Sequence, residues 1–194
     1  TPAPTFRHEL FPEYKATREK MPDELAEQLP RLREALTTLK IPLIEKHGFE
    51  ADDVMGTLAT TAAADGWEVF LVTGDKDFMQ LVNTSIKMFS PGKSNQPAEV
   101  IDTARVKEKT GVTPSQIIDY MSLTGDQSDN VPGVRGIGPK TAEKLIRQFG
   151  NLDAILANPE QINSDADRKK IESAIENASL SKKLVSIHCD LELD

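Results

Sequence analysis

The stretch Trp67-Glu-Val-Phe-Leu-Val-Thr-Gly-Asp-Lys-Asp77 indicates the fold class of this chain. Its first seven residues are nearly all apolar or β-branched, which predicts a strand in the interior of a parallel sheet. Gly74 ends the strand, and Asp75 and Asp77 follow at its carboxyl end. Ligands of open α/β sheets bind at the carboxyl ends of the strands, so these two aspartates are candidate functional residues.

Helical patterns lie on both sides of this strand. Residues 50–65 carry acids in the first turn and then Val54, Leu58 and Ala62 on one stripe, and Gly66 closes the helix. Another helix is expected to begin at Phe78, and residues 86–89 and 99–101 have the composition of short strands. The sequence therefore predicts an α/β fold with a mostly parallel sheet flanked by helices.

The chain upstream and downstream of this region follows other patterns. Residues 1–22 contain four prolines and should be irregular or only locally helical, and Asp23 to Leu39 has leucines at helical spacing. Residues 41–44 have the composition of a short buried strand, and Trp67 and Cys189 are expected in the core. From Thr103 onward helices are predicted over residues 103–109, 113–123, 139–149, 152–156, 167–177 and 179–189. We therefore divide the chain into an α/β lobe, 1–110, and a helical lobe, 111–194.

The composition excludes several classes of protein. A hydrophobic fraction of 38%, with 28% charged residues and no apolar run long enough to cross a bilayer, argues against a membrane protein. A single cysteine excludes a disulfide framework, and with no apolar leader it predicts a cytoplasmic setting. Acidic clusters lie between basic segments at 7–20 and 135–147, which suits an acidic pocket between two DNA contacts.

Seven carboxylates form the first candidate site. Each group taken alone is explained by a helix cap or a turn. If they converge, they repel one another unless cations neutralise them. All-oxygen ligation without cysteine or clustered histidine favours Mg²⁺ or Mn²⁺, and two such ions would polarise a scissile phosphate. The seven residues are Glu50, Asp52, Asp53, Asp75, Asp77, Asp126 and Asp129.

The second candidate site is the stretch Val131-Pro-Gly-Val-Arg-Gly-Ile-Gly-Pro-Lys-Thr-Ala142, within residues 131–148. Its glycines allow a tight hairpin with exposed amides, and its second proline begins a helix whose terminus attracts an anion. This helix-hairpin-helix signature predicts contact with the DNA backbone without base readout, and a plain helical corner is the alternative. The expected contacts are Arg135, Gly136, Gly138, Lys140, Thr141 and Lys144.

The third candidate site is the segment near residues 11–22. Tyr14 and Arg18 are four residues apart and share a face if the segment is helical, with Lys15 beside them. An aromatic ring next to two cations can stack on a base while the cations bind a phosphate. Spacing alone is a weak indication of this role.

Together these motifs resemble the 5′-3′ exonuclease domain of bacterial DNA polymerase I and related flap endonucleases. The resemblance rests on Glu50-Ala-Asp-Asp53, Thr73-Gly-Asp-Lys-Asp77, Gly125-Asp-Gln-Ser-Asp-Asn-Val-Pro-Gly-Val134 and Gly136-Ile-Gly-Pro-Lys-Thr-Ala142, in this order, and it covers essentially the whole chain. It implies a fold of the PIN and flap-endonuclease type whose second lobe carries the hairpin. It also implies that the seven carboxylates serve a site for two or more metal ions.

The resemblance implies further roles. Lys15 and Arg18 would belong to an arch that contacts the scissile phosphate, with Tyr14 near the terminal bases, and the hairpin would hold a monovalent cation, K⁺. Family members begin with a strand that ends in an aspartate, and a later strand supplies another. Both precede the segment that resembles Thr5-Phe-Arg-His8, so the chain is expected to lack them and to have weak activity alone.

The sequence therefore predicts a 5′ nuclease that acts on branched, nicked or 5′-flap DNA in replication and repair. The same resemblance implies a place at the bacterial nucleoid, and it leaves open whether a polymerase domain follows downstream. Two alternatives remain at this point: a non-catalytic, structure-selective DNA-binding module, and a phosphatase-like hydrolase of small substrates. The hairpin argues against the second alternative.

Overall fold

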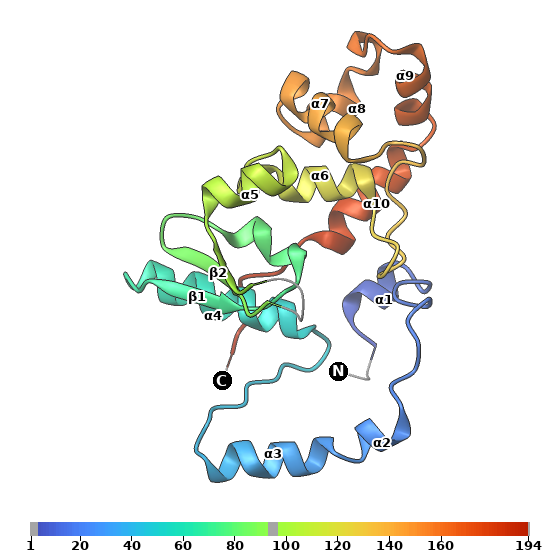
Figure 1. Ribbon diagram of the computed structural model, residues 1–194. Coiled ribbons are helices and arrows are strands. Elements are labelled where there is room, and N and C mark those ends of the chain that lie inside the picture. The colour runs from blue at the N-terminus through green and yellow to red at the C-terminus, as the bar shows by residue number, and fades with distance from the viewer. Residues whose placement is uncertain (1–3, 93–96, 194) are drawn as a thin grey trace.

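A three-stranded sheet lies at the centre of the first part of the chain. The computed structural model describes residues 4–92 and 97–193, and in this part the strand order is β1 (Val69–Val72), β2 (Ile86–Ser90), β3 (Glu99–Ile101). β1 pairs with β2 in parallel, and β2 pairs with β3 in antiparallel orientation. The three predicted strands are confirmed, and helices cover the sheet as expected for an α/β fold (Figure 1).

The predicted interior position of the first strand is wrong for the described residues. β1 is an edge strand, and its residues alternate between the core and solvent, with Leu71 buried and Phe70 and Val72 exposed. Trp67 is 68% exposed, so it is not a core residue. The continuous apolar run reflects the high β propensity of these residues, but it does not determine which face of the strand is buried against other elements.

Helix α4 (Ala51–Ala64) packs against β1 and the 3₁₀ helix η1 (Lys76–Leu81). Glu50 caps α4 together with Asp53 in a capping box, and Gly66 follows its end with a φ of 88°. The predicted helix is therefore confirmed, but the predicted stripe is not, because Leu58 is exposed. The buried face is instead made of small and polar residues, which are Asp53, Gly56, Thr57 and Ala59, together with Val54.

The C-terminal segment, residues 186–193, runs back along this face of α4. The Thr57 hydroxyl lies 3.4 Å from the carbonyl of His188, and the Thr60 hydroxyl donates to the carbonyl of Cys189 at 3.2 Å. The segment approaches α4 closely enough that a Cβ on Gly56 would lie 2.6 Å from Cγ2 of Ile187. Small residues on α4 thus make room for the end of the chain, and Cys189 is half-buried in this contact.

The segment before α4 extends away from the sheet. Helix α1 (Phe6–Leu10) is followed by hydrogen-bonded turns, and α2 (Asp23–Ala26) and α3 (Leu29–Thr38) form a strut at the edge of the molecule (Figure 1). The local helicity before Asp23 and the helical pattern after it are confirmed. The predicted buried strand over residues 41–44 is wrong, because these residues form no strand and their large apolar side chains are exposed.

The second half is helical. Its elements are α5 (Thr103–Thr110), η2 (Pro114–Gln116), α6 (Ile117–Thr124), α7 (Pro139–Phe149), α8 (Leu152–Ala157), η3 (Pro159–Gln161), α9 (Asp165–Glu172) and α10 (Ile175–Val185). The last two helices begin earlier than predicted, because Ser164 caps α9 and the chain leaves the helix at Ala174. α6 packs against α7 and α10, and the buried apolar residues of both halves form one continuous cluster.

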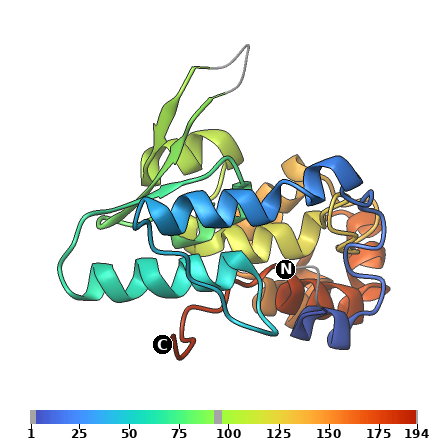
Figure 2. The ribbon, with the colours of Figure 1, turned by 90° about the horizontal axis from the view of Figure 1, so that it is seen from below.

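Helices α7, α8 and α9 gather at the opposite end of the molecule from β2 and β3, whereas α5 lies beside these strands (Figure 2). α10 spans the distance between them, since it packs on α6 and its end leads into the segment along α4. Among the residues that the structure describes, none of the helices is both long and apolar enough to cross a membrane.

Replacing Gly56 by alanine tests the contact between α4 and the C-terminal segment. Glycine to alanine in a helix interior ordinarily stabilises by about 1 kcal/mol. Here the added Cβ would collide with Ile187 and Cys189, so we expect Gly56→Ala to lower the melting temperature. Thr61→Ala, on the exposed side of the same helix, is the control and should raise it slightly. A more stable Gly56→Ala protein would show that the segment is not packed on α4 in solution.

Candidate active site

Six of the seven predicted carboxylates come together beside the end of β1. Glu50 and Asp129 are joined by Tyr14, whose hydroxyl lies 3.2 Å from the first and 3.4 Å from the second. The Lys15 ammonium also contacts both, at 2.6 Å and 3.6 Å. The N-terminus of α4 and the turn after α6 therefore meet on one side of an acidic cluster, which we call the crevice, although they are far apart in sequence.

Asp75, Asp77 and Asp126 form the other side. Asp75 caps η1 and accepts a hydrogen bond from the amide of Asp77 at 3.1 Å. Asp126 lies across from them, because Lys76 donates to its Oδ2 at 2.9 Å. The turn that carries Asp126 is closed by a bridge between Asp126 and Val131, and the close approach of Gly125 and Gly133 leaves no space for a Cβ at either glycine.

Burial and the repulsion between neighbouring carboxylates raise the pKa values of two of these acids. Burial, with the charges of Asp75 and Glu50, raises the pKa of Asp52 to about 6. Burial, with the charges of Asp75 and Asp126, raises the pKa of Asp77 to about 7. Oδ1 of Asp77 is buried and has no hydrogen-bond partner among the described residues. A buried acceptor with no donor is costly, so this oxygen is suited to a cation.

In the arrangement of the described residues, no three His, Cys, Asp or Glu side chains lie close enough together to hold a metal ion. Basic side chains separate them. Lys15 contacts Glu50, Arg18 contacts Asp129 at two nitrogens, and Lys76 contacts Asp126. The charge of the acids is therefore met by ammonium and guanidinium groups.

Asp53 does not belong with the other six. Both of its oxygens accept hydrogen bonds from Arg7 at 2.8 Å, and the amides of Glu50 and His188 donate to it as well. The side chains of Arg7 and Asp53 are 2% and 0% exposed. Burial would raise the pKa of Asp53, but the hydrogen bonds and charge of Arg7 hold it below its usual value. We therefore assign Asp53 to holding α4 in place rather than to a metal ion.

Tyr14 also differs from its predicted role beside terminal bases. The ring is 4% exposed and packs edge-on against His8, so it offers no face for stacking. Its hydroxyl instead points at Glu50 and Asp129, and burial with these two charges raises its pKa. Lys15 has a φ of 58° and Arg18 follows one turn later, so both charges are directed at the crevice from a turn rather than from a helix.

The hairpin of the second half is separate from the crevice. Gly136 has a φ of 84°, Ile137 is buried between the two glycines, and Pro139 begins α7 with Gly138 as its N-cap. Among the described residues no backbone carbonyl accepts from the amides of Gly136 and Gly138. The exposed charges on this side are Arg135, Lys140 and Lys144, and Thr141 is half-buried beside them.

Sequence reasoning missed three residues. Arg7 and Lys76 contact the acids directly, and Lys170 donates to the carbonyl of Gly136 at 3.1 Å. Lys76 lies between two predicted ligands, so its position in the sequence could have drawn attention. Arg7 and Lys170 carry no local signal, because their partners lie 46 and 34 residues away.

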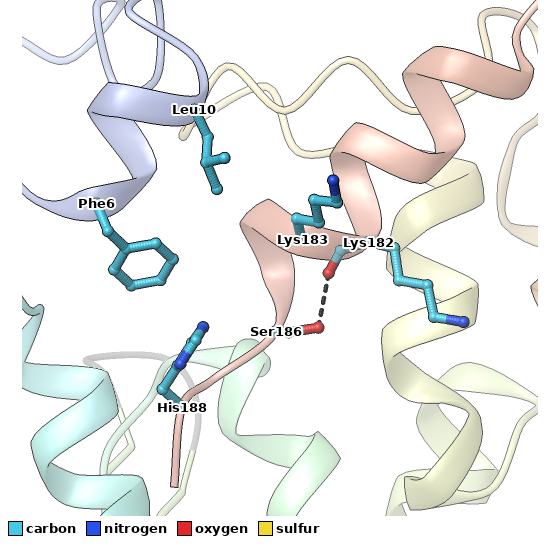
Figure 3. Close-up of a pocket in the computed structure, with 6 residues that line it drawn as sticks. All are labelled: Phe6, Leu10, Lys182, Lys183, Ser186 and His188. Carbon is cyan, nitrogen blue, oxygen red and sulfur yellow. Dashed lines mark hydrogen bonds between the residues drawn. The ribbon is translucent and has the colours of Figure 1, made fainter. Parts of the chain in front are cut away.

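A pocket near the crevice contains none of its acids. Phe6 and Leu10 of α1 face Lys182 and Lys183 of α10 across it, and His188 lies edge-on to Phe6 at a centroid distance of 4.5 Å (Figure 3). The pocket opens between α1 and the end of α10. It is a separate feature from the six carboxylates.

Comparison with known proteins gives consistent matches. Residues 1–111 match the model of the 5′-3′ exonuclease N-terminal resolvase-like domain, and residues 112–194 match that of the 5′-3′ exonuclease C-terminal SAM fold. DNA polymerase I of Bacillus caldotenax is 44% identical over 190 residues, covering 98% of this chain and 22% of that protein. The chain thus spans about a fifth of the length of the curated relatives that it matches.

Two solved structures share the fold closely. One is described as divalent metal ions (zinc) bound to T5 5′-exonuclease, with 26% identity and a TM-score of 0.81, covering 96% of this chain and 71% of that one. The other is a bacteriophage T5 flap endonuclease in a pseudo-enzyme-product complex with DNA and metal ions. It has 26% identity and a TM-score of 0.80, covering 95% of this chain and 71% of that one.

Replacing Asp77 by asparagine tests the repulsion among the acids. Because the folded pKa of Asp77 is raised from 3.8 to about 7, stability is lost as the pH rises through this interval. We expect Asp77→Asn to stabilise the metal-free chain at pH 8 by on the order of 2 kcal/mol, with no gain below pH 4. Thermal unfolding in EDTA from pH 4 to 8 measures the difference.

Glu68→Gln is the control, since Glu68 is an exposed acid whose partner is Lys87. This change should leave the pH dependence as it is. A destabilised Asp77→Asn chain at pH 8 would mean that the aspartate is satisfied without a cation.

Proposed function

This chain belongs to the 5′-3′ exonuclease family, and from this premise we propose that it hydrolyses phosphodiester bonds near the 5′ end of branched, nicked or 5′-flap DNA. The observation that carries the proposal is the crevice of six carboxylates in which Asp77 keeps a buried oxygen without a donor. The relatives named DNA polymerase I suggest replication and repair as the setting, beside a polymerase and at the bacterial nucleoid.

The donor atoms of these six acids suit a hard divalent cation, although basic side chains separate the acids in the described arrangement. We propose that Glu50, Asp52, Asp75, Asp77, Asp126 and Asp129 hold two or more Mg²⁺ or Mn²⁺ ions, since all their ligand atoms are carboxylate oxygens. When bound, such ions polarise the scissile phosphate and lower the pKa of water. The T5 5′-exonuclease structure described with divalent metal ions (zinc) supports a metal of this charge. With cations present, the raised pKa values of Asp52 and Asp77 return toward their usual range, so both acids stay ionised at neutral pH.

The basic side chains position the DNA strand. Lys15 and Arg18 reach the crevice from the turn after α1, and each has donors that a phosphate can take over from Glu50 or Asp129. We propose that they contact the scissile phosphate and stabilise the charge that develops on it. Tyr14 keeps the two acids at their places by its hydroxyl, and Arg7 with Asp53 keeps the start of α4 in place.

The hairpin would bind the duplex part of the substrate. The amides of Gly136 and Gly138, which donate to no backbone carbonyl of the described residues, lie just before α7. Arg135 precedes them, and Lys140, Thr141 and Lys144 lie in the first half of α7. Such a surface binds phosphates without reading bases. We also propose K⁺ at the backbone carbonyls of the hairpin, since the ammonium of Lys170 on the carbonyl of Gly136 indicates that this edge accepts a positive charge.

The number of carboxylates bears on the rate of cleavage. The resemblance implies two acids beyond the six, so we propose that residues 1–194 alone cleave more slowly than the longest natural form of the protein. The alternative of a non-catalytic DNA-binding module shares the hairpin with our proposal. Only cleavage separates the two.

Replacing Asp126 and Asp129 by asparagine is the direct test. In the longest natural form of the protein with Mg²⁺, we expect the double variant to cleave a 5′-flap duplex at least about 100-fold more slowly, because charge stabilisation of this kind contributes that much. Asp165→Asn, which removes one exposed carboxylate at the start of α9, is the control and should leave cleavage unchanged. No cleavage by the unchanged protein favours the binding module, and cleavage that survives the double change refutes the metal site.

Replacing Lys140 by glutamate tests the hairpin. We expect duplex binding at 50 mM salt to weaken by about tenfold, and the slope of log affinity against log salt to fall by about 1. Lys107→Glu, which makes the same charge change on α5, is the control. Equal effects of the two changes on DNA binding would indicate general electrostatic attraction. If Lys140→Glu lost DNA binding but still cleaved small phosphate esters at the unchanged rate, a phosphatase-like enzyme would be favoured.

A further inference from the structure

Lys76 occupies the acidic crevice without a part in the proposed reaction so far. It is the first residue of η1, directly between Asp75 and Asp77. Its ammonium lies 2.9 Å from Oδ2 of Asp126, and its side chain is 58% exposed where that of Asp126 is 7% exposed. The ammonium therefore covers a buried carboxylate from the solvent side.

The partners of Asp126 show what Lys76 covers. Oδ1 of Asp126 accepts from the amide of Ser128 at 2.8 Å and from its hydroxyl at 2.5 Å. Oδ2 has Lys76 as its partner. A cation that binds Asp126 through Oδ2 must therefore replace the ammonium of Lys76.

The charges around Lys76 favour this exchange. Burial would lower its pKa, but the hydrogen bond to Asp126 and the charges of Asp126, Asp77 and Asp75 raise it. A divalent cation among the same acids reverses the local field and repels a neighbouring ammonium. The exposed four-carbon side chain can turn outward at little cost, since among the described residues Asp126 is its one ion-pair partner.

From its position at the start of η1, the ammonium released by Lys76 can contact a phosphate of the DNA strand. Lys15 and Arg18 contact Glu50 and Asp129 from the turn after α1, whereas Lys76 contacts Asp126 from η1. A strand that passes the acids would have positive charges from two different elements beside it. An ammonium that leaves Asp126 remains at this border, where the nearest anion is a phosphate of the strand.

We propose that Lys76 is the resident counter-ion of Asp126 in the metal-free protein, that a divalent cation displaces it, and that the displaced ammonium binds a phosphate of the DNA strand. The inference rests on the proposed function, because it takes the crevice as the metal site. It assigns Lys76 two partners in succession, Asp126 and then DNA. No bond is made or broken in this exchange.

A titration of the metal-free chain with Mn²⁺ tests the first half. Lys76→Met removes the competing charge, so we expect the dissociation constant for Mn²⁺ to fall by about tenfold. Lys87→Met is the matched control, since Lys87 pairs with Glu68 outside the crevice, and it should leave the constant unchanged. Unchanged or weaker Mn²⁺ binding by Lys76→Met overturns the proposal.

Binding of a 5′-flap duplex tests the second half, in Ca²⁺ to suppress cleavage and separately in EDTA. We expect Lys76→Met to weaken DNA binding by roughly fivefold in Ca²⁺ and to change it little in EDTA, where the ammonium is held by Asp126. An equal loss in both conditions, or no loss in Ca²⁺, overturns the proposal. If the unchanged protein binds neither Mn²⁺ nor flap DNA, the nuclease assignment fails, whereas wild-type binding with an unaffected variant refutes the role of Lys76 alone.

Discussion

The buried ion pair between Arg7 and Asp53 is the contact on which the arrangement of the crevice depends. Arg7 donates both terminal nitrogens to Asp53, and it also binds the carbonyls of Leu184 and Ser186. Three parts of the chain, α1, the start of α4 and the end of α10, therefore meet at one guanidinium. Removing one member of such a pair would leave an uncompensated buried charge, so the three parts are fixed together. Glu50 and Asp52 owe their positions to this junction.

The acids beyond this junction have the opposite energetic character. Asp53 is fully satisfied, whereas Asp77 keeps an oxygen without a donor, and both Asp52 and Asp77 have raised pKa values. Raised carboxylate pKa values report a folded state that is less stable with these groups ionised. The ion pair of Arg7 and Asp53 therefore holds the start of α4 in place. The neighbouring acids Asp52 and Asp77 destabilise the fold when they are ionised. Strain of this kind is concentrated where a ligand can relieve it.

The sequence predicted the helices and strands better than the long-range contacts that these elements make. α4, β1 and α7 follow from local signals, namely a capping box at Glu50, a β-branched run and a proline after Gly138. Six of the seven acids lie near one another, because they stand at the starts of α4 and η1 and in the turn after α6. Their predicted role as metal ligands stays a prediction. The role of Asp53 could not be inferred, since its partner lies 46 residues upstream and nothing in the capping pattern distinguishes a satisfied acid from a free one. Edge or interior position of β1 likewise depends on strand order, which local composition does not contain.

The contact between Arg7 and the end of α10 also has a consequence for biosynthesis. Arg7 and its carbonyl partner Leu184 are separated by 177 residues in sequence. A chain that emerges from the ribosome N-terminus first exposes Arg7 early, but its partner leaves the exit tunnel only after nearly all of residues 1–194 have been translated. Long-range contacts of this kind close late in folding. The acidic residues of the nascent polypeptide therefore stay unassembled until α10 has left the ribosome, and the crevice takes shape only after that.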